Sequence, residues 1–147
     1  SSIHTRLTTM KKALVLIPVL AFALVLAVGL SAQVKKGKTR GALTKQLMGG
    51  LVRPNCAGLG AALKKEPADD KAWAALATQA ALLNEASYIL MADGRCPDGD
   101  WKAACDTLRG CSKAVMAKIE AKDLEGANTA FKALTGACGA CHKKHKK

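Results

Sequence analysis

The chain has 147 residues, half of them hydrophobic, and a formal net charge of +12. This length gives room for one small domain and excludes a second. No phosphate-binding glycine loop is present, and no Ser/His/Asp or Cys/His set stands outside a single Cys/His motif, so we expect no enzyme.

Residues 10–32 have the pattern of a secretory signal. Met10, Lys11 and Lys12 precede an 18-residue apolar run without a charged side chain, and cleavage is expected after Ala32. An uncleaved membrane anchor is the alternative, because about 18 apolar residues are just long enough to span a bilayer. Both interpretations predict export, to the periplasm or an equivalent compartment, and the second adds a membrane tether.

Beyond Ala32 the chain keeps twenty basic and eleven acidic residues, a net charge of +9. An exported protein seldom meets nucleic acid, so we expect partner proteins with acidic docking surfaces and no nucleic acid. Six cysteines are too many for idle thiols in an oxidising compartment, which predicts that they are paired or bind a cofactor.

Residues 33–41 are glycine-containing and basic, which predicts a flexible linker. From there to residue 147 the hydrophobic pattern is helical, without alternation typical of strands. The first helix is expected over residues 42–63, with a kink near Pro54. Its apolar side carries Leu43, Leu47, Leu51 and Leu59.

Three further helices are predicted, starting after Pro67 with Asp69 as N-cap, at Asp98, and near Asp123. The second is expected to bury Trp73, Leu76, Ala80, Leu83, Ser87 and Leu90. The third, ending near Ala121, is expected to bury Trp101, Ala104, Leu108, Cys111, Val115 and Ile119. The fourth is expected to turn inward Ala127, Ala130, Phe131, Leu134, Cys138 and Cys141. Short connections predict an all-α, antiparallel up-down four-helix bundle over residues 42–147.

The sequence Cys138-Gly139-Ala140-Cys141-His142 carries the clearest chemical signal. Two thiols three residues apart and an adjacent imidazole are typical of covalent haem attachment, in which the thiols form thioethers and His142 is the proximal iron ligand. A disulfide or a thioredoxin-type dithiol is the alternative, although the latter needs an α/β setting that the pattern lacks. We therefore expect one haem c as cofactor.

Over roughly residues 42–145 the chain resembles the cytochrome c prime family, the class II c-type cytochromes. The resemblance lies in the C-terminal CxxCH, in Trp73 and Trp101 at the helix starts, and in an early Met48. It implies a four-helix bundle whose first helix faces the distal side of the haem, with Met48 as candidate sixth iron ligand. Otherwise Met48 is an apolar wall beside five-coordinate iron. Family members are often dimers, and the resemblance leaves a homodimer open here.

Four cysteines remain, Cys56, Cys96, Cys105 and Cys111, which allow three pairings. Their expected heights in the bundle favour Cys96 with Cys105 and Cys56 with Cys111, and buried free thiols are the alternative. The spacings lack the paired CxxC arrangement of zinc or iron-sulfur sites. In the basic tail, His145 is expected to be a solvated residue.

The sequence thus predicts an exported monohaem c-type cytochrome that transfers electrons between protein partners. One alternative is a five-coordinate haem protein that binds small gases such as NO or CO. Another is a disulfide-stapled helical interaction module without a cofactor.

Overall fold

A computed structural model describes residues 36–146, which fold into helices, turns and one isolated β-bridge between Lys36 and Leu43. The expected signal or anchor, residues 10–32, lies outside the described residues, as does the start of the expected linker. Within residues 36–146, no helix has the length and apolar character needed to cross a membrane.

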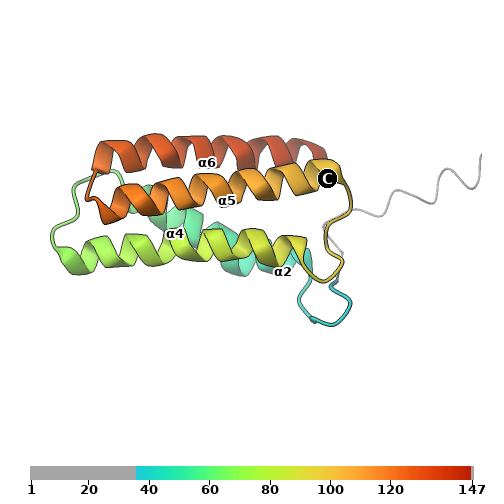
Figure 1. Ribbon diagram of the computed structural model, residues 1–147. Helices are drawn as coiled ribbons and strands as arrows, with labels where there is room; N and C mark the ends of the chain where they lie inside the picture. Colours follow the sequence, from blue (N-terminus) through green and yellow to red (C-terminus); the bar gives the residue numbers. More distant parts are fainter. Residues whose placement is uncertain (1–35, 147) are drawn as a thin grey trace, which may run out of the picture. The chain divides into compact units, whose positions relative to one another are not determined.

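Four helices pack against one another, which confirms the predicted all-helical bundle (Figure 1). The first helix is continuous but consists of α2 (Thr44–Leu47), the π-helical turn η3 (Met48–Val52) and α3 (Arg53–Ala62). It is followed by α4 (Asp70–Met91), α5 (Gly99–Glu120) and α6 (Leu124–His145). In Figure 1, α4, α5 and α6 run side by side along one axis, and the first helix lies behind α4.

An aspartate caps the start of each of the last three helices. The sequence predicts Asp69 as an N-cap, and helix starts at Asp98 and near Asp123. The Asp69 side chain accepts from the backbone N–H of Ala72, Asp98 from that of Trp101, and Asp123 from that of Gly126, each at 2.8 Å. Each carboxylate satisfies an amide that the first helical turn would otherwise leave unpaired.

Near Pro54, where a kink is expected, the helix contains a π-helical turn that ends just before α3. Proline has no N–H, and its ring crowds the carbonyl one turn earlier, so a regular α-helix cannot continue through it. A π-helical turn holds an extra residue, which shifts the apolar side of the helix. Val52 is therefore buried in place of the predicted Leu51, which is only half-buried.

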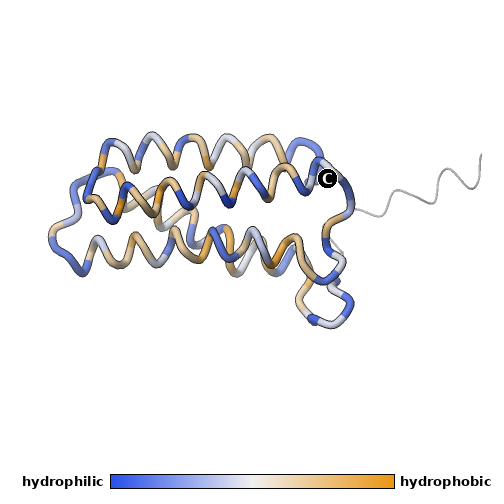
Figure 2. The backbone as a smooth tube through the Cα atoms, viewed as in Figure 1, coloured by the Kyte–Doolittle hydropathy of each residue, from blue (hydrophilic) through white to orange (hydrophobic). Residues whose placement is uncertain are grey.

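Helical periodicity predicts the core well in α4 and less well in α5. All six residues predicted for the α4 seam are buried. In α5, Ala104 and Cys111 are half-buried, and Cys105 and Ser112 are buried in their place. The Ser112 hydroxyl is satisfied by donating to the Leu108 carbonyl at 2.7 Å, so a polar side chain is tolerated there. Figure 2 shows hydrophobic residues concentrated where the helices face one another.

The first helix and α6 approach each other at only one end. There the Asn128 amide donates to the Leu63 carbonyl at 2.9 Å. Gly60 leaves room for the Phe131 ring, because a Cβ on Gly60 would lie only 2.9 Å from that ring. Close backbone contacts of α6 with α2, η3 and α3 are few, while α6 is packed on α5. A cavity lies between the first helix and the C-terminal part of α6.

We predict that Gly60→Ala does not stabilise the protein, although alanine normally favours a helix over glycine by about 0.5–1 kcal/mol. The new methyl group would displace Phe131 and offset that gain. The matched control is Gly110→Ala in α5, where a Cβ would meet nothing within 4 Å. Urea denaturation should show stabilisation in Gly110→Ala alone; equal gains in both would contradict this packing.

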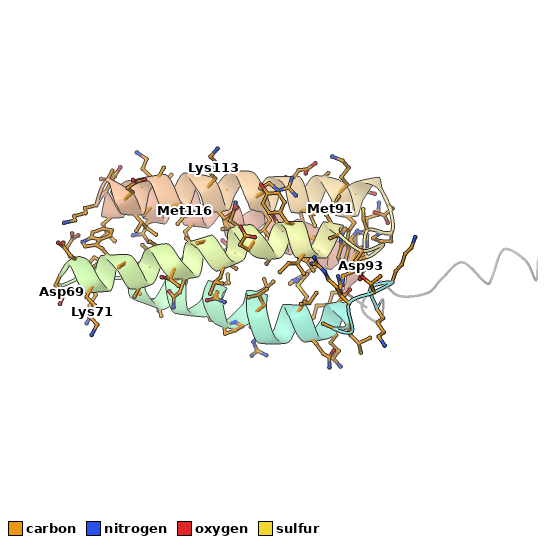
Figure 3. The ribbon with its side chains drawn as sticks, turned by 60° about the horizontal axis from the view of Figure 1, so that its bottom comes forward. Asp69, Lys71, Met91, Asp93, Lys113 and Met116 are labelled. Carbon is orange, nitrogen blue, oxygen red and sulfur yellow. The ribbon has the colours of Figure 1, made fainter. Side chains whose placement is uncertain are left out.

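Part of the expected linker is held by hydrogen bonds to the turn between α4 and α5. The Asp93 carboxylate accepts from the backbone N–H groups of Thr39 at 3.0 Å and Arg40 at 2.8 Å, and from the Thr39 hydroxyl at 2.9 Å. Arg95, 1% exposed, donates to the Ala42 carbonyl at 3.2 Å. Figure 3 shows Asp93 beside this N-terminal segment. We call residues 36–43 with Asp93 and Arg95 the N-terminal clasp.

The hydrogen bonds from Arg40 and Thr39 hold the pKa of Asp93 below its ordinary value. Because the folded pKa is lowered, the clasp is strongest above the pKa of a free aspartate, about 3.9, and weakens as pH falls through the lowered folded value. We predict that the amide NMR signals of Thr39 and Arg40 titrate together with a midpoint below about 3.9.

Asp93 has a φ of 60°, so Asp93→Gly keeps the backbone conformation while it removes the acceptor and the ion pair with Arg95 at 3.8 Å. This variant should abolish the shared titration and expose residues 36–43 to proteases. A titration of these amides that persists in Asp93→Gly would rule out the clasp.

Candidate functional site

The CxxCH motif lies in the last two turns of α6, on the side that faces the first helix. Cys138 and Cys141 are half-buried and His142 is exposed. All three residues line one cavity of about 530 Å³. Positions three and four apart share a face of an α-helix, so the helix alone brings the two thiols and the imidazole to the same wall.

The opposite wall of the cavity comes from the first helix and includes Met48. The lining residues on that side are Thr44, Lys45, Met48, Gly49, Val52, Arg53, Cys56 and Ala57. All four residues singled out from the sequence, Cys138, Cys141, His142 and Met48, therefore lie around the same cavity. Its volume falls within the range of about 300–1,000 Å³ that is usual for sites of small ligands and cofactors.

A smaller hollow of about 50 Å³ extends from the same residues toward the core. Met48, Cys138 and His142 line both spaces, and Leu90, Ala104 and Leu108 close the inner side of the smaller one. Its walls are apolar, and its volume of about 50 Å³ has room for only about three to five water-sized atoms, since a water needs roughly 10–15 Å³ on this measure.

Trp101 of α5 closes the floor of the cavity. It is 3% exposed, and its indole Nε1–H donates to the Leu90 carbonyl at 2.9 Å. Its backbone N–H is fixed by the Asp98 cap. These bonds hold the ring in one orientation, so Trp101 is a rigid apolar wall, in agreement with its expected packing role.

His145 differs from its prediction as a solvated residue, because its side chain is only 10% exposed. Its ring meets that of Trp101 edge to face at a centroid distance of 5.3 Å, and its Nε2 lies 3.7 Å from Asp98 Oδ1. Asp98 and Trp101 begin the helix that packs antiparallel to the end of α6, so the burial of His145 depends on a neighbour remote in sequence. His145 also lines the cavity.

Positive charge surrounds the cavity. Lys45, Arg53 and Lys146 are among its lining residues, and no aspartate or glutamate is. Lys45 and Arg53 come from the first helix and Lys146 from the end of α6. A ligand with an apolar body and negatively charged substituents fits this combination of apolar walls and basic residues.

The six cysteines are all free thiols in this structure, so neither expected disulfide is formed. They fall into two groups near the cavity. Burial raises the pKa of Cys105 to about 12, with Cys141 and Cys96 adding to the effect. Burial raises the pKa of Cys138 to about 11, followed by the influence of Cys56 and Cys141. Each thiol of the motif thus has another cysteine nearby, and the expected partners Cys96 and Cys105 do lie close enough to interact.

Among residues 36–146, no cluster of three or more His, Cys, Asp or Glu side chains is arranged to hold a metal ion directly. Comparison with models of known protein families, with characterised proteins and with solved structures finds no match. The cavity geometry and its chemistry are therefore the basis for a functional conclusion.

We predict that Cys138 and Cys105 of the haem-free protein react slowly with iodoacetamide at pH 8. The thiolate is the reactive form, and a pKa of about 11 for Cys138, against about 8.5 for a free cysteine, lowers its thiolate fraction more than about a hundredfold. Mass spectrometry of peptides gives the rate at each cysteine. The same protein in denaturant is the control, and equal rates for Cys138 in both states would contradict the raised pKa.

Proposed function

We propose that the protein is an exported monohaem c-type cytochrome that transfers electrons between protein partners. One observation carries this proposal. The two thiols and the imidazole of the CxxCH motif line, together with Met48, a single cavity of about 530 Å³ between the first helix and α6. The cytochrome c prime resemblance predicts this relation between the motif and the first helix.

The residues present suit each part of a haem c. Cys138 and Cys141 supply thiols for its two vinyl groups, and His142 supplies a nitrogen ligand for its iron. The apolar walls, Trp101 among them, suit the flat ring. Lys45, Arg53 and Lys146 suit its two propionates, as no acidic side chain competes for them in the lining.

When bound, haem iron alternates between the ferrous and ferric states and so carries one electron. The Cys138 and Cys141 thiols would hold the group through thioether bonds to its two vinyl groups. Burial raises the pKa of both thiols, so they are protonated at neutral pH. His142 would bind the iron, and Trp101 would form the inner wall of the site.

Met48 is the candidate for the second axial position. A thioether ligand favours the reduced state and leaves no vacancy for other ligands, which suits electron transfer. Partner proteins with acidic docking surfaces would meet the exposed Lys143, which lies outside the cavity lining, and charge complementarity would raise the rate of encounter.

Gas binding is the second candidate, and one observation favours it. Gly49, next to Met48, lines the cavity, and a Cβ on Gly49 would meet nothing within 4 Å. Free space therefore exists on the Met48 side, and the hollow of about 50 Å³ beside it could admit a diatomic ligand such as NO or CO. This function requires that Met48 does not bind the iron.

The deciding experiment is an oxidised and reduced optical spectrum of protein expressed with cytochrome c maturation machinery, compared with Met48→Ala. For the electron-transfer function we expect a low-spin oxidised spectrum with the weak long-wavelength band of thioether ligation. Met48→Ala should lose that band and become high-spin. Met116→Ala is the matched control, because Met116 packs against the core but lines neither space, and it should leave the spectrum unchanged.

A high-spin spectrum that Met48→Ala does not alter would exclude Met48 as ligand and favour gas binding, which CO titration of the reduced protein would then measure. Protein that stays colourless in the presence of the machinery would exclude both functions and leave the cofactor-free interaction module. Covalent attachment is checked by mass, which should fall to that of the bare chain in a Cys138→Ala, Cys141→Ala double variant.

A further inference from the structure

The two ends of the bundle differ strongly in charge. We call residues 36–46, 92–100 and 142–146 the cavity end, because Thr44, Lys45, His142, His145 and Lys146 among them line the cavity. This end has eight basic and three acidic residues. We call residues 63–71 and 117–126 the opposite end; it has five basic and six acidic residues. Figure 3 labels Asp93 at the cavity end of α4 and Asp69 with Lys71 at its opposite end.

The three acidic residues of the cavity end are all engaged. Asp93 holds the N-terminal clasp, Asp98 caps α5 beside His145, and Asp100 pairs with Lys144. The basic residues that remain are exposed, and within residues 36–146 they have no acidic partner: Lys36, Lys38, Arg40, Lys45, Lys143 and Lys146. The uncompensated surface at this end is therefore entirely positive.

The opposite end is neutralised locally. Lys118 pairs with Asp123 at 2.8 Å and Lys122 with Asp70 at 2.6 Å. The remaining lysines there are accompanied by unpaired acids such as Glu66 and Glu120. General solubility would not require such a difference between the ends, because it is served equally well by charges spread over the whole surface.

The N-terminal clasp fixes which end of the domain the preceding sequence leaves from. Asp93 and Arg95 hold residues 39–42 against the turn between α4 and α5, so Lys36 and Lys38 stay at the cavity end. In the sequence, the apolar run ends at Leu30, six residues before Lys36. The basic residues Lys36 and Lys38 therefore follow the apolar run closely in the sequence.

We propose that the cavity end binds an anionic bilayer surface, so that electron exchange under the proposed function takes place beside the membrane. Clusters of four to eight Lys and Arg next to an apolar segment attract anionic lipid headgroups, and each adds to the binding. An acidic protein could use the same charges. The membrane is favoured because the basic cluster is continuous with the clasped segment that leads to the apolar run. The proposal rests on the proposed function only for its consequence, not for the binding itself.

The test is co-sedimentation of the exported, haem-loaded protein with vesicles of phosphatidylglycerol and phosphatidylcholine, and with vesicles of phosphatidylcholine alone. The readout is the ratio of binding to the two vesicle types, which cancels any contribution of an apolar segment that stays on the chain. We expect a strong preference for the anionic vesicles at low salt, and its loss at about 0.5 M salt, where the charges are screened.

Two triple variants with the same change in net charge locate the surface. Lys36→Glu, Lys38→Glu, Lys143→Glu changes the cavity end at residues that do not line the cavity. Lys64→Glu, Lys65→Glu, Lys71→Glu changes the opposite end at exposed lysines that form no ion pair within residues 36–146. The first should lower the anionic preference at least about tenfold, and the second less than about twofold. Circular dichroism checks that both fold.

Equal losses in the two variants, or no preference of the wild type for anionic vesicles at low salt, would overturn the proposal. Retention on a poly-aspartate resin without vesicle binding would assign the cavity end to an acidic protein instead. Haem content is read from absorbance and binding from protein in the pellet, so a colourless protein that still binds vesicles would refute only the proposed function.

Discussion

The structure depends on the fact that the first helix and α6 are joined at one end only. The Phe131 ring lies against Gly60, and the Asn128 amide reaches the Leu63 carbonyl, so the two helices are fixed where α3 ends and α6 begins. The core is built mostly of leucine and alanine, with aromatic residues making up 3% of the chain, so few large side chains are available to fill the space farther along α6. The cavity is the space this bundle cannot fill itself.

The π-helical turn contributes to the same result from the other side. Pro54 prevents a regular helix just where the first helix faces the CxxCH motif, and the extra residue of η3 relieves the conflict. Met48, Gly49 and Val52, all within the turn, line the cavity. The π-helical turn thus determines which residues of the first helix face the CxxCH motif. π-helical turns are frequent at functional sites for this reason, since they alter a face without breaking the helix.

The sequence predicted those features whose causes are local. The Asp69 cap depends on residues three positions apart, and the α4 seam on steps of three and four, and both predictions are confirmed. In α5 two adjacent apolar stripes compete, and Ser112 is buried because Asn84 of α4 donates to its hydroxyl at 3.0 Å. That bond joins residues 28 positions apart, which no local pattern contains. The CxxCH wall of the cavity was visible in the sequence for the same local reason.

What the sequence did not predict depends on contacts between distant segments. His145 is buried because Trp101 and Asp98 lie against it, 44 and 47 positions earlier. The basic residues Lys45 and Arg53 could not be assigned to the cavity without the path of the first helix. The N-terminal clasp joins Thr39 to Asp93 across 54 positions, and neither residue stands in a recognisable motif.

The position of the cavity at one end of the bundle, and not at its middle, gives the same region two tasks under the proposed functions. Lys45, Arg53 and Lys146 line the cavity, where their charge would neutralise the two propionates of the haem. Lys36, Lys38 and Lys143 lie outside the lining and keep their charge for an external surface. The clasp holds the first two of these beside the cavity, because Asp93 fixes the backbone that carries them. An electron carrier needs its redox centre close to its docking surface. Here the haem cavity and the basic docking surface would lie at the same end of the bundle, and no basic residue would serve both.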